Sequence, residues 1–298
     1  MRVFVTGATG FIASALVPEL LREGHKVLGM TRTEKGAAAL AKLGAEAHQG
    51  TLEDIESLKA GAAKADAVIH LAFNHDFSKL QANCEDDRRA IEGMGAALAG
   101  SGRPFIVSSG VLVDNPVPGK PFDEDDPKPI MRFPRVSEEA TLATVEKGVR
   151  GVVMRLSQIH DTHRQGLVSF LIRMAVEKKV SAYVGEGSNR WAAAHLSDTA
   201  RLYRLALEKG TAGSKWHAVG EQGVTSKDIA EALGKRLDLP VVSISPEEAP
   251  AHFGFLSYFM TLDSPTSNTN TRERLGWEPT GRSLIEDLNQ LVLPEGAQ

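Results

Sequence analysis

Apolar and polar positions follow two different rhythms along the first half of the chain. Short apolar, β-branched runs are typical of buried strands, and they occur at 3–5, 26–30, 45–49, 67–73, 104–108 and 151–156. Between them, apolar residues recur at the spacing of amphipathic helices, at 12–22, 36–43, 52–63, 86–98 and 137–147. This alternation predicts an α/β fold with a parallel, doubly wound sheet covered by helices on both faces.

The alternation of strand-like and helix-like patterns becomes less regular after about residue 156. Helices are expected at 167–177, 196–208, 226–237 and 283–291, and extended pieces at 182–184, 215–219 and 241–244. We therefore predict a sheet domain at 1–155 and, at 156–298, mainly a smaller C-terminal cap that binds substrate over the ligand edge of the sheet. Elements at about 195–220 are expected to return to the sheet.

The composition of the chain argues against several classes of binding partner. The formal net charge of -4 argues against nucleic acid, whose phosphates call for a basic surface. The single cysteine, Cys84, permits neither an internal disulfide nor a cysteine-rich metal cage, and we predict no metal site. No apolar run approaches the roughly 20 residues of a membrane span, and no basic leader is visible. We expect a cytoplasmic protein with a small-molecule substrate and leave a homodimer open.

A glycine-rich turn, "TGATGFIA", follows the first strand and opens the first helix. Gly7 permits the tight turn and Gly10 lets the backbone approach a pyrophosphate, which the helix N-terminus attracts. The strand–turn–helix context predicts a Rossmann-type dinucleotide site here, with Thr9, Phe11 and Ile12 beside the glycines. The alternative is a turn that serves packing only.

The second strand ends in "MTRTEK", where an NAD site usually places a carboxylate for the ribose 2′-hydroxyl. Arg32 stands there instead and would pair with the 2′-phosphate of NADP, while Glu34 argues the other way. We predict NADP(H), with NAD(H) as the less favoured cofactor.

Further motifs occur in order along the chain: "GTLED", "VIHLAF", "FIVSSG", "MRLSQIH", "GEGSNRWAAAHLSDTARLYRLAL" and "TRERLGW". Together with the glycine turn they resemble the extended, or atypical, short-chain dehydrogenases/reductases of the sugar-epimerase, 3β-hydroxysteroid-dehydrogenase and dihydroflavonol-reductase type. The resemblance implies that Leu52 borders the adenine, although Thr51 stands where many members have aspartate. It also implies further cofactor contacts from Leu71, Ala72, Phe73, Ser108, Leu156 and Ser157.

The catalytic tyrosine and lysine of that family are absent. In the family, a tyrosine gives the proton, a lysine four residues later lowers its pKa, and a serine polarises the carbonyl. Ser109 matches the serine, with Gly110 as the competitor and backbone capping as the alternative role. Pro134 and Glu138 fall at the tyrosine and lysine positions, and Glu138 is expected to cap its helix with Ser137 or to interact with the helix dipole.

Other groups offer replacements for the missing acid. His75 follows the fourth strand and His160 ends the sixth, so both are expected at the ligand edge. Arg135 or Arg132 would stabilise negative charge on oxygen without releasing a proton. Each of the four has a plain alternative as a loop or capping residue. Aromatic residues of the cap would line an apolar substrate pocket: Tyr183, Trp191, Phe253, Phe255, Tyr258 and Phe259.

Two classes of function remain open from the sequence. The first is an NADP(H)-dependent oxidoreductase for a small or medium carbonyl or alcohol, with Ser109 on the oxygen and a non-standard proton donor. The second is a non-catalytic NADP(H)-binding sensor or regulatory protein, which the missing Tyr–Lys pair favours. A sugar-nucleotide epimerase or dehydratase is the weaker alternative, because it needs the same missing base.

Overall fold

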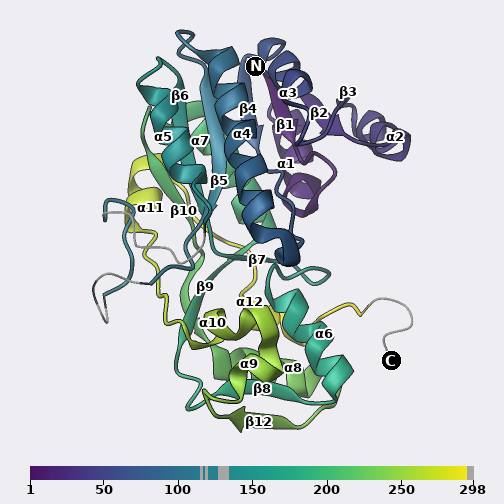
Figure 1. Ribbon diagram of the computed structural model, residues 1–298, viewed down its shortest axis with the longest axis vertical. Helices are drawn as coiled ribbons and strands as arrows, with labels where there is room; N and C mark the ends of the chain where they lie inside the picture. The colour runs from purple at the N-terminus through teal and green to yellow at the C-terminus, as the bar shows by residue number, and fades with distance from the viewer. Residues whose placement is uncertain (115–116, 118–119, 127–133, 294–298) are drawn as a thin grey trace.

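The computed structural model describes residues 1–114, 117, 120–126 and 134–293 (Figure 1). Arg132, a candidate cation from the sequence, lies outside these residues. In the part of the chain that is described, no helix combines the length and the apolar character that crossing a membrane requires.

A seven-stranded parallel sheet forms the upper part of the molecule (Figure 1), as the alternating pattern predicts. Its order is β10-β6-β5-β4-β1-β2-β3, so the direction of strand succession reverses between β1 and β4. The strands are β1 (Arg2–Thr6), β2 (Lys26–Thr31), β3 (Glu46–Gln49), β4 (Ala67–His70), β5 (Pro104–Gly110), β6 (Arg150–Leu156) and β10 (Lys215–Ala218). In such sheets a ligand site is expected where the order reverses, at the carboxyl ends of the strands.

Helices cover both faces because neighbouring residues of each apolar strand enter different cores. Val3 and Val5 pack with α1 (Phe11–Arg22) and α7 (Leu196–Lys209). Phe4, between them, packs on the other face with Leu58 and Ile91. That second face carries α3 (Ile55–Ala63), α4 (Leu80–Leu98) and α5 (Ser137–Val145), while α2 (Glu34–Leu43) packs beside β3.

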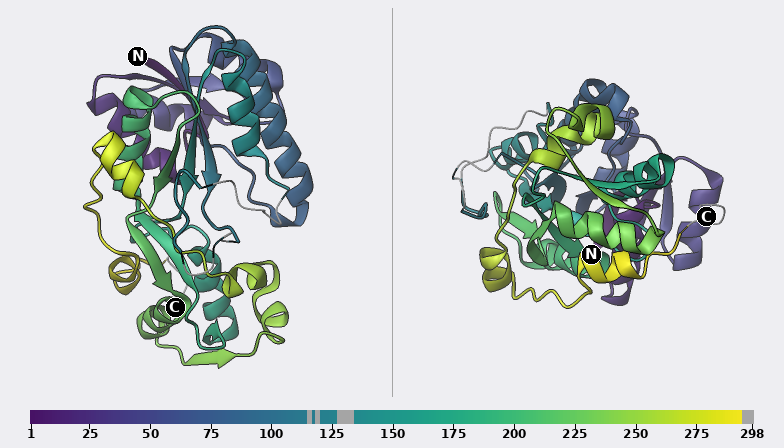
Figure 2. Two further views of the ribbon diagram at one scale, coloured as in Figure 1. Left: turned by 90° about the vertical axis from the view of Figure 1, so that its left-hand side faces the viewer. Right: turned by 90° about the horizontal axis from the view of Figure 1, so that it is seen from below.

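A smaller part lies below the sheet (Figures 1 and 2). It holds a three-stranded sheet, β11-β9-β7, and a two-stranded sheet, β12-β8. Its core gathers Trp191, Ile229, Phe253 and Leu256. The strands are β7 (Gln158–His160), β8 (Ser181–Val184), β9 (Arg190–His195), β11 (Glu221–Thr225) and β12 (Val241–Ile244). The helices are α6 (Val168–Lys178), α8 (Ser226–Leu237), α9 (Ala249–Phe253), η2 (Gly254–Leu256), α10 (Ser257–Thr261) and α12 (Leu284–Asn289).

The chain crosses between the two parts more than once. After β7 and β9, helix α7 packs against α1, and β10 adds a strand beside β6, with Trp216 opposite Met154. Helix α11 (Thr269–Leu275) then packs against α7 and β10. The large sheet is therefore completed by residues from the second half of the chain.

Several boundaries differ from the sequence pattern, and two of them flank the segment after β4. Strand β4 ends at His70 instead of residue 73, because Leu71 and Ala72 donate their N–H groups to the Thr6 hydroxyl and leave the ladder. The short helix η1 (Phe77–Lys79) then precedes α4, which begins at Leu80 rather than at residue 86. The extended segment between β4 and η1 lies at the edge where a ligand is expected.

Candidate functional site

A cleft of about 860 Å³ opens at the carboxyl ends of the large sheet and reaches the cap. Its volume suits a small-molecule ligand. Its lining includes most of the residues expected to bind cofactor: Gly7, Thr9, Gly10, Phe11, Ile12, Arg32, Leu52, Leu71, Ala72, Phe73, Leu156 and Ser157. Ser109, His75 and Arg135 line the same cleft. Their placement in one cavity is what the predictions require, while ligand binding itself stays a prediction.

The glycine turn at the floor of the cleft fits a phosphate. Gly7 has φ +65°, and a Cβ there would lie 3.0 Å from the backbone nitrogen of Ala72, so only glycine allows this close approach. Helix α1 begins after Gly10 without a side-chain cap. Its first N–H groups are therefore available to an anion, and the helix dipole favours negative charge there.

Arg32, which directly follows β2, is the residue expected to contact the ribose of the cofactor. Arg32 is exposed, lines the cleft and has Glu53 as an electrostatic neighbour. A hydrogen bond from the Thr51 side chain, aided by the charge of Arg32, lowers the pKa of Glu53. Thr51 stands where many members of the resembled family have aspartate. Here its side chain hydrogen-bonds to the Glu53 carboxylate, which lies near Arg32.

The two serines at the end of β5 face different surroundings. Ser108 is buried, donates to the His70 carbonyl oxygen at 2.7 Å and lies 2.8 Å from the Tyr203 hydroxyl. Burial raises the pKa of Tyr203, and this tyrosine is completely enclosed, so it does not replace the missing acid. Ser109 lies in the cleft wall. Among described residues its hydroxyl has no hydrogen-bond partner, which leaves it free for a ligand oxygen.

Arg135 lies just before α5 and brings a positive charge into the cleft. Its guanidinium carbon is 4.1 Å from the centre of the Phe73 ring, and Nη2 donates to the carbonyl oxygen of Ser108 at 3.0 Å. The side chain is 23% exposed, so its charge is screened only in part. Arg135 is therefore placed beside Ser109, the residue expected to hold a substrate oxygen.

A buried chain of polar groups fixes Arg135. Its Nε donates to the Ser137 hydroxyl at 2.7 Å and lies 3.5 Å from Oδ2 of Asp87, which the Ser137 hydroxyl also contacts. His70 links Asp87, 3.2 Å from its Nε2, to Thr6, 2.7 Å from its Nδ1. Burial alone raises the pKa of Asp87, but the His70 hydrogen bond and the Arg135 charge bring it below its ordinary value. The sequence did not single out Asp87.

Glu138, at the position of the family's lysine, has a different partner. Its carboxylate makes two hydrogen bonds with Arg155 of β6, at 2.7 and 3.0 Å, and both side chains are almost completely buried. Arg155 also donates to Nε2 of His217 at 3.0 Å. Burial and the Arg155 charge lower the pKa of His217 to about 3, so this imidazole stays neutral. The expectation of a cap was wrong, because α5 has no side-chain cap. Glu138 does lie in the first turn of α5, where the helix dipole favours a carboxylate, and it is half of a buried ion pair.

His75 lies at the exposed rim of the cleft. Its ring is 5.3 Å from that of Phe73 and 6.2 Å from that of Phe77, in edge-on contacts. Desolvation by these neighbours and the charge of Arg135 lower the pKa of His75 below 6.5. At neutral pH His75 is therefore an uncharged base that faces the cleft.

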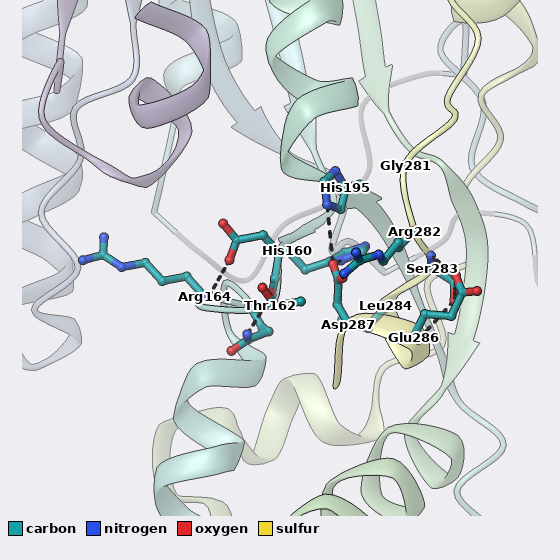
Figure 3. A network of polar contacts seen from close by, with 12 residues as sticks. His160, Thr162, Arg164, His195, Gly281, Arg282, Ser283, Leu284, Glu286 and Asp287 are labelled. Atoms are coloured by element: carbon teal, nitrogen blue, oxygen red, sulfur yellow. Dashed lines mark hydrogen bonds and ion pairs between the residues drawn. The ribbon is translucent and has the colours of Figure 1, made fainter. Parts of the chain in front are cut away.

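His160 belongs to a network behind the cleft (Figure 3). It is completely buried, and its Nδ1 lies 2.7 Å from Oδ2 of Asp287, which also faces Nε2 of His195 at 3.7 Å. Asp287 comes from α12, so the network holds that helix against β7 and β9. His160 lacks the access to the cleft that a proton donor needs.

The aromatic residues of the cap divide between its core and the cleft. Trp191 and Phe253 are buried in the core of the cap. Phe259 lines the cleft, and Phe255 is 41% exposed. Tyr183 lies under the Lys227 ammonium group.

Restoring the family's residue type at position 138 should destabilise this protein. Glu138→Lys sets a second cation against the buried Arg155 and removes its anion, which should cost about 3–5 kcal/mol of unfolding free energy. Urea denaturation measures the loss. Glu146→Lys, an exposed charge reversal at the C-terminal end of α5, should change stability by less than about 0.5 kcal/mol. A Glu138→Lys protein as stable as the wild type would contradict the assignment.

Known proteins similar to this chain agree with the fold. The NAD dependent epimerase/dehydratase family model matches residues 3–219. Protein C2A9.02 of Schizosaccharomyces pombe is 48% identical over 291 residues, 97% of this chain and 98% of the relative. A 4-hydroxy-2-methyl-3-oxo-4-farnesyl-3,4-dihydroquinoline-1-oxide ketoreductase of Stigmatella aurantiaca is 26% identical over 273 residues, 85% of this chain and 80% of the relative.

Among solved structures, DesIV of Streptomyces venezuelae, a dTDP-glucose 4,6-dehydratase with NAD and TYD bound, has a TM-score of 0.78. It is 18% identical, and the match covers 97% of this chain and 95% of that one, so the likeness concerns the fold. With the family model matching most of the large sheet and its glycine turn, the chain belongs to the NAD-dependent epimerase/dehydratase family and has its NAD(P)-binding, oxidoreductase-type Rossmann fold.

Proposed function

We propose that the protein is an NADP(H)-dependent oxidoreductase that interconverts a carbonyl compound and an alcohol. The observation that carries the proposal is the meeting of Ser109, Arg135 and His75 in one cleft with the glycine turn. Ser109 would donate a hydrogen bond to the substrate oxygen, Arg135 would stabilise negative charge on it, and His75 would exchange the proton. The ketoreductase relative supports a carbonyl substrate.

The cofactor proposal rests on the two ends of the cleft. The uncapped N-terminus of α1 and the glycine turn would hold the pyrophosphate, and Arg32 would pair with the 2′-phosphate of NADP. When bound, NADP(H) supplies or accepts the hydride. Leu156 and Ser157, at the other end, would border its nicotinamide.

The protonation state of His75 favours alcohol oxidation at neutral pH. A neutral imidazole accepts the alcohol proton, whereas carbonyl reduction needs the imidazolium, which is scarce above a lowered pKa. Arg135 keeps its charge in both directions because its guanidinium does not titrate. Arg135 would therefore provide most of the stabilisation of negative charge on the substrate oxygen that the tyrosine and lysine provide in the resembled family.

One observation favours a second candidate, a non-catalytic NADP(H)-binding protein. Glu138 is engaged with Arg155, and Pro134 carries no acidic proton, so neither replaces the standard pair. This candidate predicts nucleotide binding with no turnover of any carbonyl or alcohol. A broad substrate panel with NADPH and NADP separates the two candidates.

Arg32 should determine cofactor choice. Arg32→Ala removes a charge-assisted contact worth about 1.5–3 kcal/mol, so NADPH should bind roughly ten- to a hundredfold more weakly, with NADH little changed. Titration calorimetry with both nucleotides measures this, and Lys35→Ala, a nearby exposed cation, serves as the matched control. Equal losses for NADPH and NADH would refute the assignment.

Arg135 should stabilise the reacting oxygen. Arg135→Met should lower kcat/KM for the best carbonyl about 10²- to 10³-fold while NADPH binding changes little, and Arg135→Lys should recover part of the rate. Ser109→Ala should show a similar loss. Arg88→Met, which removes a partly buried cation on α4 outside the cleft lining, is the control and should keep full activity. If Arg135→Met keeps its rate, the guanidinium does not act on the substrate.

His75 should set a limb of the pH profile. In alcohol oxidation, kcat/KM should rise with pH through a pKa below 6.5 and then level off, because only neutral His75 accepts the proton. Carbonyl reduction should fall through the same pKa. His75→Gln should abolish this limb and lower the plateau rate about 10²-fold or more. An identical profile in the variant would exclude His75 as the proton carrier.

A further inference from the structure

The segment after β4 presents aromatic rings to the cleft at every second position. Phe73, His75 and Phe77 all line the cleft, and each ring meets the next edge-on, at 5.3 and 6.2 Å. Phe73 and His75 lie in a segment without regular secondary structure, and Phe77 is the first residue of η1. Asn83 of α4 fixes this segment by donating to the backbone carbonyl oxygens of Asn74 and Asp76.

Two further rings come from the cap and meet Phe77. The Phe255 ring of η2 stacks on Phe77 with centroids 4.6 Å apart and planes 18° apart. Phe170 of α6 contacts both rings edge-on, at 5.8 and 5.2 Å. We call Phe77, Phe170 and Phe255 the aromatic clamp. It joins three segments that are distant in the sequence: Phe77 and Phe170 line the cleft, and Phe255 lies outside that lining and stacks against Phe77.

Each of the three rings of the clamp keeps part of its surface in contact with water. Phe255 is 41% exposed, and Phe77 and Phe170 are only half-buried and line the cleft. Phe170 also packs against the core of the cap, so only the parts of these rings that remain in contact with water are open to a ligand. A ligand that covers those parts would gain the energy of their burial on binding, which is typical of a recognition surface.

The row of rings begins at the proposed reacting groups. Arg135 lies over Phe73, and the row then runs through His75 to the clamp. Leu80, Leu112, Leu167 and Phe259 add apolar lining to the same cleft. Among the described lining residues the only carboxylate is that of Glu53, which follows β3 at the edge of the sheet. The surface beyond Arg135 is thus mainly apolar and suits an uncharged apolar group, with Arg164 as a cation on the same lining.

We propose that the substrate is an uncharged carbonyl compound with an apolar ring, which the aromatic clamp binds while the carbonyl reaches Ser109 and Arg135. This inference rests on the proposed oxidoreductase function and adds the substrate class. The ring would gain about 30-fold in binding from contact with two or three phenyl groups. Arg164, an exposed cation that also lines the cleft, provides the competing explanation: a substrate with a carboxylate.

Three methyl ketones that differ only in the distal group test the substrate class. Butan-2-one has no distal group, 4-phenylbutan-2-one has a ring, and 4-oxopentanoate has a carboxylate. With NADPH, kcat/KM should be at least about 30-fold higher for the phenyl ketone than for butan-2-one. A preference for 4-oxopentanoate or for butan-2-one, which has no distal group, would overturn the inference.

Variants of the clamp test its role. Phe77→Ala and Phe255→Ala should each lower the phenyl-to-butanone ratio about tenfold, while Phe255→Leu should keep most of it. NADPH affinity should stay unchanged in all three. Leu43→Ala, which truncates an exposed apolar side chain of α2 outside the cleft lining, is the control and should keep the full ratio. A ratio that survives both alanine variants would contradict the clamp.

A binding measurement separates this inference from the proposed function. 4-Phenylbutanamide carries the same ring but does not accept hydride, and calorimetry can titrate it into the NADP-loaded protein. If no ketone turns over but the amide binds and loses about tenfold affinity in Phe255→Ala, the oxidoreductase proposal fails while the ring site stands. Turnover of ketones without amide binding or ring preference overturns the ring site alone.

Discussion

The buried carboxylate of Asp87 is the interaction on which the arrangement of the site depends. It is 1% exposed, and His70 from β4, Ser137 from α5 and Arg135 surround it. A buried charge is tolerated only when such partners compensate its lost hydration. The positions of all three side chains are therefore constrained by their contacts with the carboxylate. Through His70 the same constraint reaches Thr6, whose hydroxyl accepts hydrogen bonds from the segment after β4. The end of β1, the segment after β4 and the Arg135 guanidinium are thus joined by one network of hydrogen bonds and ion pairs.

The cleft holds a positive charge, but this charge comes from a different position than in the resembled family. In the resembled family the cation comes from the first turn of a helix, where this chain has Glu138. That carboxylate neutralises Arg155, which lies on β6 opposite Ser109 in the strand register. The cation in the cleft comes instead from the residue two positions before α5, and Asp87 holds it. A guanidinium offers charge without a labile proton, so in the proposed reaction another group would carry the proton.

The sequence was sufficient where local geometry decides the outcome. Gly7 and Gly10 are read directly from the turn, because only residues without a side chain allow such close backbone approach. It was insufficient where one step of register decides which way a side chain points. Ser108 and Ser109 are neighbours, yet one faces Tyr203 and the other the cleft. His160 stands at a strand end, as expected, but long-range packing against α12 encloses it.

Asp87 shows a signal that was available in the sequence. In "CEDDRR" it reads as one of several solvated charges. Its helical spacing indicates instead that Asp87 is buried. Cys84, Ile91 and Met94 lie three, four and seven residues away, so they share the apolar face of α4 with Asp87. A carboxylate on the apolar stripe of a helix indicates a buried partner, although only tertiary structure identifies it.

The late return of the chain to the large sheet has a consequence for how the protein can be divided. Strand β10 supplies the outermost neighbour of β6, and α7 covers the apolar face beneath Val152 and Met154. A fragment ending with β6 would expose an unpaired strand edge and an uncovered apolar surface, both of which promote aggregation. Folding of the nucleotide-binding half during synthesis must therefore wait until about residue 218 has left the ribosome.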